Sequence, residues 1–95
     1  NMKTKLIGES ELSLGTINTT LVSPREVFAE ALRRNAAAVI LLHNHPSGDP
    51  TPSREDVLAT RRVIDAGKII GIELLDHIII GDNCFISLRD KGFFK

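Results

Sequence analysis

Apolar and polar residues alternate loosely over residues 3–14, which predicts one strand, or two short strands around Gly8. Gly15 is then expected to turn the chain into a β-branched stretch at residues 16–21. Residues 36–42 contain no polar side chain. A short apolar run of this kind is typical of a strand that is buried on both faces in the middle of a sheet.

The last third of the chain predicts a pair of strands. Residues 72–80 are rich in isoleucine and form the first of them. Residues 81–83 contain the glycine, aspartate and asparagine of a hairpin turn, and residues 84–88 form the returning strand.

A helix is predicted to begin after Ser23. Serine is a good N-cap, Pro24 suits the first helical position, and Glu26 completes a capping box. The helix is expected to end near Arg34 or Asn35.

A second helix is predicted after a loop at residues 44–52, where four prolines and glycines prevent regular structure. Ser53 is the expected N-cap, and Gly67 is the expected C-cap. An apolar stripe at helical spacing supports the helix, and it is formed by Val57, Thr60, Val63 and Ile64. The resulting order, β-β-α-β-α-β-β, predicts an α/β sandwich with a mixed sheet.

Length and charge narrow the choice of protein class. The 95 residues are enough for one domain, and 42% of them are hydrophobic, which is sufficient for a compact core. The chain has 12 basic and 12 acidic residues. This balance argues against a strongly basic nucleic-acid module, and the pairs Arg33/Arg34 and Arg61/Arg62 are interpreted as solvated helix faces.

Cysteine usage and hydropathy bear on the compartment. The single Cys84 forms no disulfide within the chain and is consistent with a reducing, cytoplasmic location. No apolar run approaches the roughly 18 residues of a membrane span, and no signal peptide is recognisable.

Candidate chemistry is concentrated where the apolar run ends. His43 and His45 are two positions apart, so they point to one side if the strand keeps its pleat. Asp56 falls at the third residue of the second helix, and the intervening loop is long enough to bring that helix start back to the strand end. Two imidazoles and one carboxylate form a ligand set suited to Zn²⁺, with a fourth position left for water.

Less specific interpretations remain open for these residues. A His-x-His pair at a strand end is compatible with ordinary hydrogen-bonded loop residues, and Ser53 and Asp56 are also explained by helix capping. Asp49 is a competing ligand, although an Asx turn before Pro50 is its commoner role.

Asp76 and His77 form an unusual acid–imidazole pair in an isoleucine-rich strand. They are either a pair that orients a ligand histidine or, as we favour, a buried polar pair satisfied by the backbone.

The spacing His43-x-His45-Pro46, six residues, Ser53, two residues and Asp56 resembles the JAMM motif of JAB/MPN metalloproteases. The surrounding residues, among them SPRE at 23–26, HNHPSGDP at 43–50 and LDH at 75–77, resemble the bacterial RadC family, also called UPF0758. The resemblance implies a JAB/MPN fold, which is a cytidine-deaminase-like sandwich of a mixed sheet flanked by helices. It extends from about Leu6 onward, and residues 1–95 are expected to form one RadC-type domain that lacks an N-terminal part.

The resemblance also implies roles for individual residues. It implies that His43, His45 and Asp56 bind Zn²⁺, and that Ser53 acts catalytically by hydrogen bonding to the zinc water or to an oxyanion. Enzymes with this motif also use an upstream glutamate as general base. That glutamate is expected before the start of this chain, because Glu9 and Glu11 do not match its position and are interpreted as exposed strand residues.

The function implied by the resemblance is zinc-dependent hydrolysis of a peptide or isopeptide bond in an unidentified peptide or protein substrate. The alternative is a DNA-repair-associated module that binds DNA or protein partners without catalysis. DNA binding is expected only through regions outside this chain, because its net charge is zero and it has no aromatic stacking platform. No membrane partner is expected.

Overall fold

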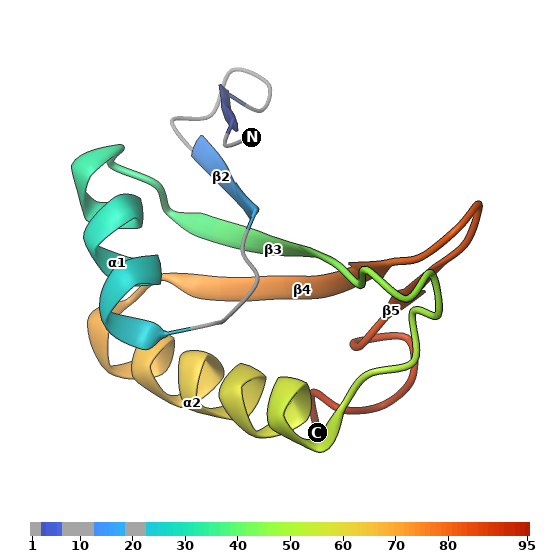
Figure 1. Cartoon of the computed structure of the whole chain (residues 1–95). Coiled ribbons are helices and arrows are strands. Elements are labelled where there is room, and N and C mark those ends of the chain that lie inside the picture. The colour runs from blue at the N-terminus through green and yellow to red at the C-terminus, as the bar shows by residue number, and fades with distance from the viewer. Residues whose placement is uncertain (1–2, 7–12, 19–22) are drawn as a thin grey trace.

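The computed structural model describes residues 3–6, 13–18 and 23–95. Its elements follow the predicted order (Figure 1). They are β1 (Lys3–Leu6), β2 (Ser13–Asn18), α1 (Pro24–Arg33), β3 (Ala38–Asn44), α2 (Arg54–Ile70), β4 (Glu73–Ile80) and β5 (Phe85–Ser87).

The strands form one five-stranded sheet in the order β1-β2-β3-β4-β5. The inner pairs β2–β3 and β3–β4 are parallel, and the outer pairs β1–β2 and β4–β5 are antiparallel. β3 and β4 run side by side through the middle of Figure 1, with α1 and α2 beside them. The predicted fold class, a mixed sheet with flanking helices, is therefore confirmed.

The N-terminal strands differ in one respect from the prediction. The turn expected at Gly15 is wrong, because Gly15 lies inside β2 and is paired with Thr4 on one side and Val39 on the other. Pairing on both sides gives the glycine backbone a full set of ladder neighbours, and this outweighs its intrinsic preference for turns. The predictions for Glu9 and Glu11 lie outside the described residues.

The central strand β3 has two different faces. Val39, Leu41 and His43 are buried, whereas the alternate residues Ile40 and Leu42 are only half-buried. The expectation of a strand buried on both faces is thus wrong for one of them. The reason is that the buried residues of α1 and α2 join the same core cluster and therefore cover the same face of the sheet.

The start of α1 was predicted only in part. Pro24 occupies the first turn as expected, but the side chain of Ser23 makes no capping hydrogen bond, so the proposed capping box with Glu26 is wrong. The carbonyl of Ser23 accepts the N–H of Val27 at 3.0 Å. The start therefore relies on the fixed backbone angle of Pro24 rather than on the serine hydroxyl.

The end of α2 lies one turn beyond the predicted one. Gly67 is inside the helix, and Gly71, with φ of 89°, is the C-cap. The Gly67 carbonyl accepts hydrogen bonds from Gly71 at 2.8 Å and from Ile72 at 3.0 Å. A Cβ at Gly67 would overlap the Ile72 carbonyl oxygen, so this glycine permits a close approach rather than a helix end.

Neither α1 nor α2 is long and apolar enough to cross a bilayer.

Candidate metal centre

Two histidines extend from the end of β3 toward one point. His43 is the penultimate residue of β3 and pairs with Ile79 of β4. The backbone stays aligned with β4 beyond the strand, because the N–H of His45 donates to the Ile80 carbonyl at 2.9 Å. The alternation of the strand therefore continues to His45, and the two imidazole centroids lie 4.7 Å apart.

A short, internally bonded loop returns the chain from β3 to α2. The N–H of Gly48 donates to the His45 carbonyl at 3.0 Å, and the Gly48 carbonyl accepts the N–H of Asp82 at 2.8 Å. The Asp49 carboxylate accepts the backbone N–H of Thr51 at 3.0 Å, which confirms the predicted Asx turn. The bond between Gly48 and Asp82 attaches the loop to the turn between β4 and β5.

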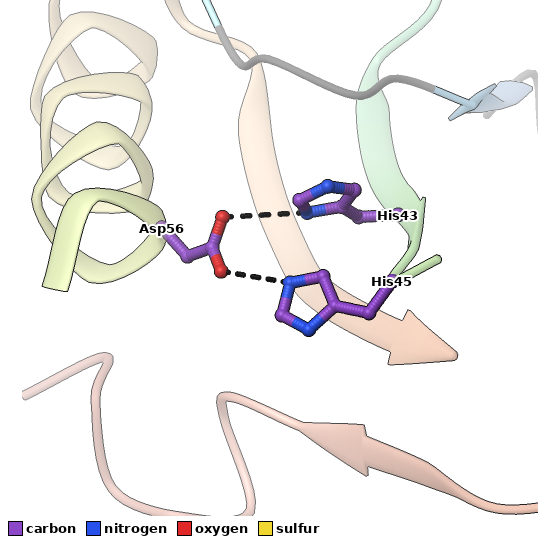
Figure 2. A group of neighbouring side chains, drawn as sticks. All are labelled: His43, His45 and Asp56. Carbon is purple, nitrogen blue, oxygen red and sulfur yellow. Dashed lines mark hydrogen bonds and ion pairs between the residues drawn. The ribbon is translucent and has the colours of Figure 1, made fainter. Parts of the chain in front are cut away.

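Asp56 is held at the start of α2 by a capping box. The N–H of Asp56 donates to Ser53 Oγ at 3.0 Å, and the N–H of Ser53 donates to Asp56 Oδ2 at 2.8 Å. Both oxygens of the Asp56 carboxylate also face the two histidines (Figure 2). Asp56 Oδ1 lies 3.3 Å from His43 Nδ1, and Asp56 Oδ2 lies 3.0 Å from His45 Nε2.

The charges of this group are those of a metal site. Burial lowers the pKa of His43 and outweighs the opposing effect of the Asp56 carboxylate, so the ring is neutral at pH 7. Burial acts to raise the pKa of Asp56, but the hydrogen bonds from Ser53 and the nearby histidines outweigh it and hold the pKa below its ordinary value. The group therefore combines a neutral imidazole with an anionic carboxylate.

Two ring nitrogens face the Asp56 carboxylate. Within the described residues, His43 Nδ1 is buried without a hydrogen-bond partner. His45 Nδ1 lies 2.9 Å from the Asp49 carbonyl, which only accepts, so this nitrogen carries the proton. The other nitrogen of the ring, His45 Nε2, lies 3.0 Å from Asp56 Oδ2. The bond to the Asp49 carbonyl therefore orients the ring so that Nε2 faces the carboxylate, which is the orientation a shared metal ion would need.

The separations are also compatible with a metal. The ligand atoms of His43, His45 and Asp56 all lie within 4.8 Å of one another. Two ligands of a tetrahedral zinc with bonds of about 2.1 Å are about 3.4 Å apart. The separations of these ligand atoms are therefore compatible with a zinc ion. Among the residues that the structure describes, they are the one such group of three or more.

Two further candidates from the sequence, Ser53 and Asp49, are not among the three grouped ligands. Ser53 lies beside the group through its bonds to Asp56. Asp49 is not a member of the group. Its carboxylate is turned toward Thr51, and the hydrogen bond from the Thr51 hydroxyl lowers the pKa of Asp49.

Asp76 and His77 lie on opposite sides of β4. The Asp76 carboxylate accepts the Ser87 hydroxyl at 2.5 Å and the Arg89 N–H at 3.1 Å. The side chain of His77 is fully buried, with Nδ1 2.6 Å from Thr60 Oγ1. The favoured interpretation, a pair satisfied by the backbone, is therefore wrong for the imidazole, because its partner is a side chain.

Thr60 is the residue that the sequence interpretation missed. It was included in the apolar stripe of α2, yet its hydroxyl donates to the Asp56 carbonyl at 2.6 Å and accepts from His77. A threonine one helical turn after a candidate ligand was the available signal. His77 Nε2 has no partner in the described part of the chain, and leaving such an atom buried costs about 1–3 kcal/mol.

Comparison with known proteins identifies the family. The model of the RadC-like JAB domain matches residues 1–93. This chain belongs to the RadC-like JAB family. The resemblance inferred from the JAMM spacing and the RadC-like segments is therefore confirmed.

Several known proteins are similar to this chain over most of its length. UPF0758 proteins of Desulforamulus reducens and Bacillus cereus are each 60% identical over 92 residues, which is 97% of this chain. A UPF0758 protein of Desulfitobacterium hafniense is 61% identical over 90 residues, which is 95% of this chain. The matched regions make up 40%, 41% and 40% of these three relatives, respectively, so the chain spans about two fifths of their length.

Proposed function

We propose that this RadC-like JAB domain is a zinc-dependent metallohydrolase that cleaves a peptide or isopeptide bond. The observation that carries the proposal is the convergence of His43 Nδ1, His45 Nε2 and the Asp56 carboxylate, whose ligand atoms all lie within 4.8 Å of one another. Zinc in such a site supplies Lewis acidity for polarising a carbonyl and activating water.

The residues of the chain have separable tasks in this proposal. His43 and His45 present ring nitrogens from the end of a central strand, where the two ring centroids lie 4.7 Å apart. Asp56 supplies the anionic ligand and is held by the first turn of α2. Ligands held by a strand end and a helix start would keep a bound metal in one place, where it would polarise a substrate carbonyl.

Ser53 is proposed to contact the reacting oxygen. Its Oγ accepts the N–H of Asp56, and this bond leaves the hydroxyl hydrogen available for donation. A donor placed beside the ligand group stabilises negative charge as it develops on a carbonyl oxygen. The proton acceptor is proposed to be the upstream glutamate that the JAMM resemblance implies. Among the side chains that the structure describes, Asp56 is the one carboxylate grouped with the histidines.

The alternative is a module that binds DNA or protein partners without catalysis. The zero net charge of the chain gives DNA binding little support. The basic pair Arg33/Arg34 is in addition neutralised in part, because both side chains are paired with Glu30. A DNA module predicts binding that weakens steeply with salt.

The test is hydrolysis of linear peptides and of isopeptide-linked peptides by a purified protein that carries this chain together with the upstream glutamate, before and after removal of metal with a chelator. We expect cleavage to stop on chelation and to return with zinc. His45→Ala should remove at least about 99% of the activity, since it deletes a ligand. Asp49→Asn is the matched control, because asparagine preserves the Asx turn and Asp49 lies outside the ligand group. Cleavage that survives both chelation and His45→Ala would contradict the proposal.

A further inference from the structure

A β-bulge in β4 determines which way His77 points. Val39 pairs with Leu74, but the next residue of β3, Ile40, pairs with Asp76, so Leu75 has no opposite residue. The extra residue reverses the alternation of β4. Leu74 and His77 therefore face the same side and are both buried, at 3% and 0% exposure.

The bulge is held in place by one hydrogen bond from outside β4 and one within it. Arg89 Nε donates to the carbonyl of Leu75 at 2.6 Å, and the Asp76 carboxylate accepts the N–H of His77 at 2.7 Å. The same carboxylate binds Ser87 and the N–H of Arg89. The position of His77 is thus fixed by the strand and by the segment that follows β5.

Thr60 connects His77 to the helix turn that carries Asp56. The hydroxyl of Thr60 has one hydrogen, which it donates to the Asp56 carbonyl at 2.6 Å. The contact of 2.6 Å between Thr60 Oγ1 and His77 Nδ1 is therefore donated by the imidazole. A chain of two hydrogen bonds runs from β4 to the first turn of α2.

The other face of His77 contacts a candidate ligand. Its ring is stacked on that of His43, with centroids 6.0 Å apart and planes inclined by 22°. The Thr60 bond sets the rotation of the His77 ring, and the stacked ring limits the rotation of His43. His77 therefore contacts the strand end directly, through His43, and is linked to the helix start through Thr60.

We propose that His77 and Thr60 are positioning residues of the metal centre. They hold the His43 ring and the Asp56 turn at the separation that a metal requires before the metal arrives. This inference rests on the proposed function in that it assumes a metal at His43, His45 and Asp56. It assigns a role to two residues that touch neither the metal nor the substrate.

A role in core packing alone does not explain the arrangement. An apolar pair of the same shape would fill the space between α2 and β4 without leaving His77 Nε2 buried and without a partner among the described residues. The bulge and its three side-chain anchors would also be unnecessary, because a regular strand buries an apolar residue equally well. The polar chain is explained when its task is to hold the ligands in place.

The experiment compares zinc affinity in the purified protein and in three variants, by competition with a chromophoric chelator. Thr60→Val removes the hydroxyl and retains the side-chain shape, whereas Thr60→Ser retains the hydroxyl and is the matched control. His77→Phe retains a stacked ring and removes the Nδ1 donor. Cobalt(II) substitution adds a second readout, because its visible absorption reports the geometry of the ligands.

We expect Thr60→Val and His77→Phe to bind zinc at least about tenfold more weakly than the parent, as is usual when a residue that orients a ligand is lost. Their cobalt absorption should change in shape. Thr60→Ser should remain within about threefold of the parent, since its hydroxyl makes the same two bonds.

Three results would overturn the inference. The first is parental zinc affinity and an unchanged cobalt spectrum in Thr60→Val. The second is an equal loss of affinity in Thr60→Ser and Thr60→Val. If Thr60→Val does not fold, parental affinity in His77→Phe is decisive instead. A parent protein that binds no zinc overturns the proposed function itself, together with the positioning role, and is recognised before any variant is measured.

Discussion

Ser53 and Asp56 hold each other through two reciprocal hydrogen bonds, at 3.0 Å from the Asp56 N–H and at 2.8 Å to the Asp56 carboxylate. The carboxylate oxygen that accepts the Ser53 N–H also faces His45 Nε2 at 3.0 Å. The cap of α2 and the proposed metal site therefore share one atom. A residue that looks like an ordinary helix cap determines where a ligand is placed.

Ser53→Ala should lower both stability and metal affinity. Loss of an N-cap side chain typically costs about 1 kcal/mol. Ser23→Ala is the matched control, because the Ser23 side chain makes no capping bond at the start of α1. Denaturant unfolding of the metal-free proteins should show the loss in Ser53→Ala and almost none in Ser23→Ala. Equal midpoints for both variants would show that the capping box contributes nothing.

The stability of the metal-free protein should fall in mildly acidic solution. Burial, with a smaller contribution from His43, lowers the pKa of His77 to about 4, below its ordinary value of 6.5. The unfolded chain therefore binds more protons between these two pH values. The contribution of His77 is complete above about pH 6.5 and is lost as the pH falls toward 4, by about 3 kcal/mol in total.

This pH dependence is measured by denaturant unfolding in the presence of a chelator at pH 7, 5.5 and 4.5. His77→Phe should show a shallower decline than the parent, since its ring takes up no proton. Parallel curves for the two proteins would show that another group controls the acid sensitivity.

Gly81→Ala should disturb the metal site from outside it. A Cβ at Gly81 would overlap the carbonyl oxygen of Gly48, in the loop between His45 and Ser53. The loop would have to move, and zinc affinity should fall about tenfold or more. Gly71→Ala is the control, because it strains a residue with φ of 89° at the far end of α2, with open space around it. That variant should lose stability and retain zinc affinity. The opposite pattern would contradict the role assigned to the loop.

The sequence was sufficient to predict the order of the elements and the convergence of three side chains. Strand alternation at His43 and His45, a proline-rich loop and a serine cap three residues before Asp56 are all local signals, and each was retained in the fold. The family followed from the same residues. The errors at Gly15 and Gly67 arose because a glycine is compatible with both a turn and a close backbone contact, and only the neighbouring strand or carbonyl decides between them.

The support around the site was beyond what the sequence reveals. The bulge at Leu75 changes the side of the sheet on which His77 lies, and the amino-acid sequence of β4 contains no signal for this bulge. Thr60 resembles one more member of the apolar stripe until His77 is placed beside it. Both features depend on tertiary register, which periodicity along one element does not encode.

The most direct test of the central claim is a zinc titration of the metal-free protein, with stoichiometry measured by calorimetry and by elemental analysis after dialysis. Parallel titrations of His43→Ala, His45→Ala and Asp56→Asn identify the ligands, and Asp49→Asn serves as the control. We expect about one tightly bound zinc per chain in the parent and in Asp49→Asn, and loss of tight binding in the other three variants. Two results would contradict a zinc site at these residues. One is a parent that retains no zinc, and the other is zinc that stays tightly bound in each of the three ligand variants.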